Sequence, residues 1–164
     1  MSSISVLILM GSDSDAPVMQ AAVDVLREFD VPCEMTVASA HRSPERVMRL
    51  VAEAPGRGVR LFIVGAGAAA HLGGVVAAHT TLPVIGVPID SSALKGMDAL
   101  LSTVQMPPGV PVATVAIGKP GATNAGVLAV QMLALADAGL AAKLVEYKKK
   151  LEAKVEAAAA KLKG

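Results

Sequence analysis

The sequence predicts an α/β protein in which a five-stranded parallel sheet lies between two layers of helices. Apolar runs of strand length alternate with longer segments whose apolar residues recur at helical spacing, a pattern typical of βαβ units. Hydrophobic residues make up 53% of the chain but aromatic residues only 2%, so small side chains let neighbouring backbones pack closely. A chain of 164 residues has the size of one domain, and we expect residues 1–164 to form it.

The expected elements follow from the apolar runs and from residues that start or stop helices. Ser14 or Asp15 can cap the first helix, and Ser43 is an N-cap candidate followed by Pro44 in the first turn of the second. Gly56 marks the exit from that helix. The strands are expected at residues 5–10, 34–38, 61–64, 84–87 and 113–117, and the helices between them at residues 15–28, 44–53, 70–79, 97–104 and 123–137.

The tail from residue 141 to 163 is rich in Ala, Lys and Glu and is expected to form a long helix. A helix with an apolar stripe opposite a lysine-rich face can lie on a membrane surface or pack within an oligomer. The glutamates among the lysines favour packing within an oligomer. The high apolar share of the whole chain also favours burial between subunits. The apolar residues of the tail recur every three or four positions, at Leu144, Tyr147, Leu151, Val155, Ala158 and Leu162.

Charge and composition argue against several classes of protein. The net charge is +1, and there is no basic stripe outside the tail, so nucleic acid is not an expected partner. Residues 122–142 are long enough to span a bilayer, but they contain Asn124, Gln131 and Asp137, which favours a buried interface helix over a membrane span. The N-terminus has no basic region before the first strand, so we expect no signal peptide and a cytoplasmic protein.

Neither a metal nor a cofactor is expected. The single cysteine, Cys33, has no second cysteine to pair with inside the chain and is expected to be a small core residue. The histidines at positions 41, 71 and 79 are dispersed in the sequence, without the spacing of a metal site. No Walker or Rossmann fingerprint is present.

A first polar cluster runs from Gly11 to Asp15, directly behind the first strand. Glycine permits a tight turn, and the free amides at a helix N-terminus favour an anion. Ser12 and Ser14 can donate from their hydroxyls. Asp15 is expected to accept hydrogen bonds from sugar hydroxyls, because a carboxylate repels phosphate at close range. Taken alone, these five residues fit a helix cap better than a ligand loop.

A second polar cluster, Ser39-Ala40-His41-Arg42, follows the second strand. The planar guanidinium of Arg42 suits phosphate oxygens, and Ser39 can add a hydrogen bond. His41 lies between them, and a histidine can give and take a proton near neutral pH. Because the carboxyl ends of parallel strands share one edge of a sheet, the two clusters predict a phosphorylated, hydroxyl-bearing ligand there. The residues alone leave a catalytic and a structural His41 equally open.

A third cluster, residues 65–74, follows the third strand and carries almost no side-chain bulk. Small residues let the main chain wrap a planar ligand, and they also let helices approach closely. His71 can hydrogen-bond a ligand or fix the loop. The sequence leaves both interpretations open.

With these segments, the chain resembles the N5-carboxyaminoimidazole ribonucleotide mutase (PurE) family of purine biosynthesis, of the mutase class. The match runs nearly end to end, through MGSDSD at residues 10–15, SAHRSP at 39–44, GAGAAAHLGG at 65–74, GVP at 86–88, STVQMP at 102–107 and PVATVAIG at 111–118. The resemblance implies a flavodoxin-like three-layer fold and a homo-octamer. It also implies that a C-terminal helix, at about residues 139–164, packs between subunits.

By the same resemblance, His41 would be the general acid and base, and Arg42 and Ser39 would hold the 5′-phosphate. The other residues implied at the substrate are Gly11, Ser12, Ser14, Asp15, Ala40, Gly67, Ala68, His71 and Leu72. Two positions depart from the family pattern: Ala68 replaces a usual glycine and Gly73 a usual proline. If position 68 needs a positive φ, alanine costs roughly 1 kcal/mol there.

The expected reaction moves a carboxyl group within one closed site. N5-carboxyaminoimidazole ribonucleotide (N5-CAIR) loses CO2 as His41 protonates the departing nitrogen; C4 then recaptures the CO2, and the same imidazole takes the C4 proton. Two alternatives stay open: an aminoimidazole ribonucleotide (AIR) carboxylase that uses free CO2, and a non-enzymatic nucleotide-binding module.

Overall fold

The computed structural model describes residues 4–162 and contains a fully parallel five-stranded sheet in the order β2-β1-β3-β4-β5. This is the strand order of flavodoxin-like proteins, so the predicted fold class is confirmed. The strands are β1 Val6–Met10, β2 Cys33–Val37, β3 Leu61–Gly67, β4 Val84–Ile89 and β5 Ala113–Thr114. The helices are α1 Ala16–Glu28, α2 Pro44–Glu53, α3 Leu72–Ala78, α4 Met97–Val104, α5 Gly118–Ala134 and α6 Ala138–Lys161, with short 3-10 turns at η1 Asp13–Asp15 and η2 Pro55–Arg57.

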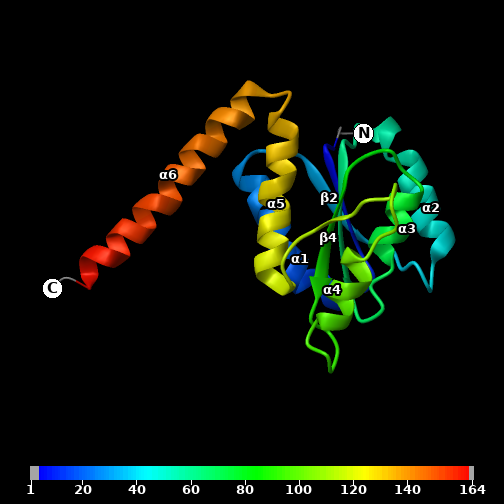
Figure 1. The fold of residues 1–164 in the computed structure, drawn as a ribbon. Helices are drawn as coiled ribbons and strands as arrows, with labels where there is room; N and C mark the ends of the chain where they lie inside the picture. The colour runs from blue at the N-terminus through cyan, green and yellow to red at the C-terminus, as the bar shows by residue number, and fades with distance from the viewer. Residues whose placement is uncertain (1–3, 163–164) are drawn as a thin grey trace. The chain divides into compact units, whose positions relative to one another are not determined.

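Helices cover both faces of the sheet (Figure 1). On one face, α1 packs against the first part of α5, where Gly126 lets the two helices approach: a Cβ built there would lie 2.8 Å from Val25 Cβ. On the other face lie α2, α3 and α4. Because β1, β3 and β4 are buried on both faces, their sequences are continuous apolar runs.

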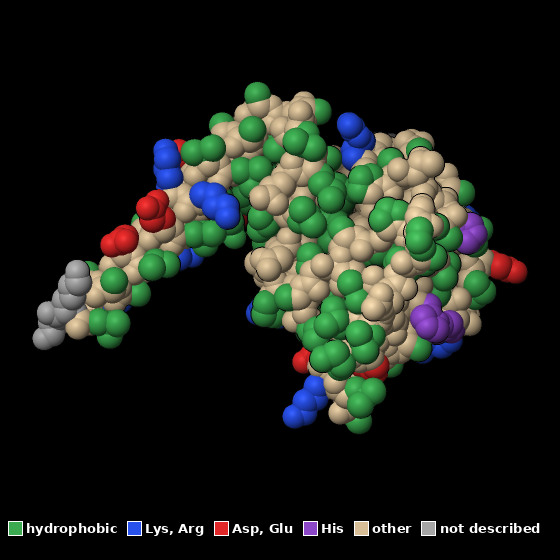
Figure 2. Space-filling view, viewed as in Figure 1, with side chains coloured by type: hydrophobic (Ala, Val, Ile, Leu, Met, Phe, Trp, Pro, Cys, Tyr) green, Lys and Arg blue, Asp and Glu red, His purple; other side chains and the backbone are tan. Residues whose placement is uncertain are grey.

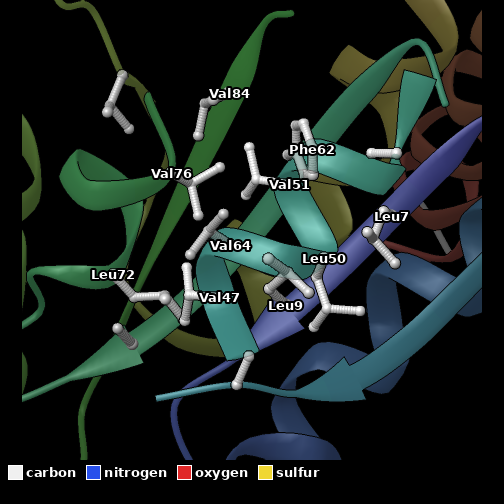
Figure 3. Packing of buried hydrophobic residues seen from close by; sticks show 14 of the residues in the cluster. Leu7, Leu9, Val47, Leu50, Val51, Phe62, Val64, Leu72, Val76 and Val84 are labelled. Carbon is white, nitrogen blue, oxygen red and sulfur yellow. The ribbon is translucent and has the colours of Figure 1, made fainter. Parts of the chain in front are cut away.

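A cluster of buried hydrophobic residues fills the space between the sheet and the helices α2 and α3 (Figure 3). Leu9 and Val64 point from adjacent strands toward Val47 of α2 and Val76 of α3. All four side chains are at most 2% exposed. Burying these side chains holds the strand ends rigidly, and the loops that follow the strands carry the polar clusters.

Three boundaries differ from the sequence prediction for backbone reasons. β5 pairs over only two residues, and α5 begins at Gly118 rather than at residue 123, with Gly118 at φ +73°. Pro120 lies in the first turn of α5, where a missing N–H costs nothing. α3 begins at Leu72, two residues later than expected, because Ala68 has a left-handed backbone.

The chain divides into two compact units, one up to Ala129 and one from Val130 onward. In the second unit, Asp137 is the N-cap of α6, and its Oδ1 accepts a 3.0 Å hydrogen bond from the Leu140 amide. None of the residues of α6 is buried. The long tail helix is confirmed up to Lys161; the predictions for residues 1–3 and for Lys163 lie outside the described residues. None of the helices in residues 4–162 combines the length and apolarity needed to cross a membrane.

Candidate active site

The carboxyl ends of β1 to β4 surround an open pocket of about 340 Å³. Ligand sites of open α/β sheets lie at this edge. The pocket lies wholly within the first compact unit. Its lining consists of Gly11, Ser12, Ser14, Asp15, Ser39, Ala40, His41, Arg42, Ala66, Gly67, Ala68, Ala69, Leu72 and Ser91.

The loop after β1 is held by hydrogen bonds among its own residues. Asp15 Oδ2 accepts from the Ser12 amide at 3.1 Å, and Ser12 Oγ accepts from the Ser14 amide at 3.3 Å. The Ser14 hydroxyl donates to Ser12 Oγ at 2.8 Å. The cap predicted at Ser14 or Asp15 is therefore made mainly by Ser12, which caps η1, and Asp15 makes no side-chain cap of α1. Both serine hydroxyls stay at the pocket surface.

Asp15 is a carboxylic acid that is only 5% exposed. Burial raises the pKa of Asp15 above its ordinary value, while the Ser12 amide and the Arg42 guanidinium partly offset the rise and Asp13 adds to it. Keeping the Asp15 carboxylate ionised in this buried position therefore costs free energy, and a hydrogen-bond donor such as a sugar hydroxyl would reduce that cost.

We expect Asp15→Asn to gain stability relative to the wild type as the pH rises. An acid with a raised native pKa binds its proton more tightly in the folded state, so the wild type loses stability from about its unfolded value of 3.8 upward, until the native pKa is passed. Asparagine cannot ionise and escapes this loss. Urea unfolding of both proteins across a pH series measures the difference, which should level off above the native pKa. The prediction is contradicted if the difference in free energy of unfolding does not change with pH, or if the variant becomes less stable relative to the wild type as the pH rises.

The loop after β2 is fastened to the loop after β1 through Arg42. Arg42 Nη2 donates to the Gly11 carbonyl at 2.9 Å, and the Arg42 amide donates to Ser39 Oγ at 3.2 Å. Ser43 does not cap α2; its hydroxyl donates to the Ser39 carbonyl at 3.2 Å and accepts from the Ser39 amide at 3.0 Å. Arg42 Nε also donates to Ser39 Oγ at 3.5 Å. The Arg42 side chain is exposed at the pocket, so its other N–H groups can meet an anion.

His41 and His71 form a direct pair, 30 residues apart in sequence. His41 Nε2 lies 2.8 Å from His71 Nδ1, and the rings meet edge to face with centroids 4.9 Å apart. One nitrogen donates and the other accepts, so one hydrogen lies between the rings. Two of the three histidines, far apart in the sequence, are thus neighbours in the fold. Among residues 4–162, no group of three His, Cys, Asp or Glu side chains could hold a metal ion.

The loop after β3 contains a strained residue. Ala68 has φ +50°, which is uncommon for a residue with a Cβ. The Ala70 amide donates to the Ala68 carbonyl at 2.9 Å, and the His71 amide donates to the Ala69 carbonyl at 2.8 Å. These tight turns bring His71 back toward His41.

Ala68→Gly is expected to raise the free energy of unfolding by up to about 1 kcal/mol, because glycine adopts this conformation without a Cβ clash. Denaturant unfolding at neutral pH measures the change. Ala69→Gly is the matched control: Ala69 has no positive φ, so there glycine only adds unfolded-state entropy and should lower stability. Equal destabilisation by both substitutions would contradict the assignment of strain to Ala68.

The structure brings together nearly all the residues singled out in the sequence. Eleven of the twelve line the pocket, and the twelfth, His71, contacts His41 from beside it. The sequence analysis missed three lining residues: Ala66, Ala69 and Ser91. Ala66 and Ala69 lie within the third cluster. Ser91 follows β4, and the sequence analysis had singled out no polar cluster after that strand. The expectation that ligands bind at the carboxyl ends of parallel strands applied there as well.

A sequence profile of the AIR carboxylase family matches residues 5–154, which is most of the chain and all of the pocket. The chain belongs to the AIR carboxylase family. Within this family, N5-carboxyaminoimidazole ribonucleotide mutase of Bacillus subtilis is 58% identical over 85% of this chain and 86% of its own length. The mutase of Synechocystis is 55% identical over 90% of this chain and 83% of its own length. The resemblance seen in the sequence motifs is confirmed.

Other members of the AIR carboxylase family are larger or more distant. Phosphoribosylaminoimidazole carboxylase of Candida glabrata is 54% identical over 94% of this chain, which spans only 27% of that protein's length. The crystal structure of Treponema denticola PurE superposes with a TM-score of 0.87 over 97% of this chain and 98% of that chain, at 29% identity.

Proposed function

We propose that this chain is an isomerase, an N5-carboxyaminoimidazole ribonucleotide mutase that converts N5-CAIR reversibly to 4-carboxyaminoimidazole ribonucleotide (CAIR). The observation that carries the proposal is a histidine at an open pocket of about 340 Å³, paired with a second histidine and flanked by Arg42 and serine hydroxyls. The relatives named as mutases, at more than 50% identity over most of both chains, support the same reaction.

In this proposal, Arg42 and Ser39 hold the 5′-phosphate, and Asp15 accepts from the ribose hydroxyls. A guanidinium binds phosphate through charge-assisted hydrogen bonds. The bond from Arg42 to the Gly11 carbonyl holds the guanidinium plane in place. The phosphate and the sugar thereby orient the heterocycle toward His41.

His41 carries the proton in both halves of the reaction. The C–N bond of the carbamate breaks to release CO2 while His41 protonates the nitrogen; C4 attacks the trapped CO2, and His41 takes the C4 proton back. The net reaction consumes no proton, so one imidazole suffices. His71, hydrogen-bonded to His41, orients the ring.

The decisive experiment is a spectroscopic assay of the purified chain for interconversion of N5-CAIR and CAIR without ATP. A second reaction, carboxylation of AIR by CO2, is favoured by the names of the family and of the Candida glabrata relative. Initial rates with N5-CAIR, compared with those from AIR plus bicarbonate, separate the two. Ribonucleotide binding without turnover in either assay contradicts both and supports a binding module.

The assembly belongs to the same proposal: we infer a homo-octamer. Apolar side chains gather at the surface over α4 (Figure 2), where Leu94, Met97, Leu101 and Val104 are 46% to 65% exposed. Such a stripe on a soluble chain favours contact with another subunit. On α6, Val155 is 67% exposed, in keeping with the apolar stripe expected to pack in the oligomer. A light-scattering mass of eight 16.6 kDa chains is expected; a monomeric mass contradicts the inference.

A further inference from the structure

Ser91 is the pocket residue that neither the sequence motifs nor the proposed mechanism uses. It follows β4 by two residues, and its hydroxyl lies directly over Gly67, the last residue of β3. In the sheet register, Gly67 is the neighbour of Ile89. Ser91 therefore extends the polar edge of the sheet to a fourth strand.

Gly67 makes room for this hydroxyl. A Cβ built on Gly67 would overlap Ser91 Oγ and lie 3.0 Å from Ser91 Cβ. Gly67 does not have a positive φ, so its backbone does not call for glycine. The absent side chain at position 67 is thus explained by the space that the Ser91 hydroxyl occupies in the pocket wall.

The hydroxyl of Ser91 is available to a ligand. Within residues 4–162 it makes no hydrogen bond. Its neighbour Ser92 contrasts with it, because the Ser92 hydroxyl donates to Asp98 Oδ2 at 2.7 Å and accepts from the Leu94 amide at 3.1 Å. Ser92 holds the loop after β4, and Ser91 is left to face the pocket.

The position of Ser91 along the sheet edge indicates which part of the ligand it meets. The strand order places the loop of Arg42, after β2, at one end of the pocket and Ser91, after β4, at the other. Between Arg42 and Ser91, the lining after β3 consists of alanine, glycine and leucine, which have no side-chain donors. The His41–His71 pair joins the loops after β2 and β3, so a ribonucleotide with its phosphate at Arg42 would place its heterocycle between that pair and Ser91.

We propose that Ser91 is a further substrate-contacting residue, whose hydroxyl donates a hydrogen bond to the carboxylate that moves between N5 and C4. This inference rests on the proposed function. A donor at the far end of the pocket would hold the carboxylate in both carboxylated ribonucleotides, and it would have no partner in AIR, which lacks that group. A hydrogen bond to a charged group is stronger than one between neutral groups, so its loss should discriminate between these ligands.

The test is Ser91→Ala, with KM and kcat measured from CAIR and the inhibition constant measured for AIR as a competitive inhibitor. We expect KM for CAIR to rise about tenfold and the constant for AIR to stay within about twofold. Ser102→Ala is the matched control, because the Ser102 hydroxyl donates to the Asp98 carbonyl of its own helix and lies outside the pocket lining. Both constants should be unchanged in that control.

The assignment of Ser91 to the carboxylate is overturned if Ser91→Ala changes KM for CAIR and the inhibition constant for AIR by the same factor, or if it changes neither constant. Absence of turnover in the wild-type chain would instead overturn the proposed function. In that case, dissociation constants for CAIR and AIR, measured by titration calorimetry on the wild type and Ser91→Ala, decide the role of Ser91 by the same comparison.

Discussion

His41→Asn is expected to lose interconversion of N5-CAIR and CAIR in both directions, by at least about 10³-fold, while binding of the ribonucleotide changes only a few-fold. Asparagine keeps a polar side chain of similar size but cannot carry a proton, and general acid–base catalysis contributes factors of about 10² to 10⁴. The phosphate and ribose contacts assigned to Arg42 and Asp15 stay in place. Single-turnover rates in each direction and calorimetric binding of AIR measure the two quantities.

His79→Asn is the matched control for His41→Asn. His79 is exposed at the end of α3 and outside the site pocket, with its Nδ1 2.8 Å from the Val75 carbonyl. The control should retain wild-type turnover. Near-normal turnover of His41→Asn would remove His41 from the mechanism, whereas loss of ribonucleotide binding in that variant would assign His41 to binding.

Arg42→Ala is expected to weaken binding of AIR by about 100-fold. Two hydrogen bonds from a guanidinium to phosphate are each worth about 1.5 kcal/mol or more, and 1.4 kcal/mol is about tenfold in affinity. The corresponding nucleoside, which has no phosphate, should bind the wild type and the variant equally. Calorimetric titration with both ligands measures the contrast.

Arg49→Ala provides the comparison for Arg42→Ala. Arg49 is an exposed arginine on α2, outside the pocket lining, so its removal changes the net charge equally without touching the site. A similar loss of affinity in both variants would indicate general electrostatic attraction. A loss of nucleoside binding in Arg42→Ala would show that Arg42 supports the loop rather than the phosphate.

The sequence predicted most of the fold, because buried parallel strands and amphipathic helices leave strong local patterns. Helices α2 and α4 begin and end where expected. The prediction was weakest at β5 and at the start of α5, and the start of α3 also differed, because backbone geometry determines these boundaries. The left-handed conformation of Ala68 is set by the turn between β3 and α3, and no helix or strand propensity encodes it.

The site was predictable where its residues are neighbours in sequence and not where the fold brings distant residues together. The clusters behind β1 and β2 stood out because several polar residues follow an apolar run. The hydrogen bond between His41 and His71 joins two loops through the arrangement of β2, β1 and β3. Ser91 depends in the same way on the register of β3 against β4. Such contacts follow from strand order, which local patterns do not specify.

The hydrogen bonds within the loop after β1 have a consequence for the kinetics of binding. Ser12, Ser14 and Asp15 hold one another in place by hydrogen bonds within the loop itself, so this wall of the pocket is preorganised. An incoming nucleotide does not have to freeze these side chains, and the conformational entropy of doing so has already been lost during folding. Capture at this wall is therefore governed by diffusion and charge, without a slow rearrangement step.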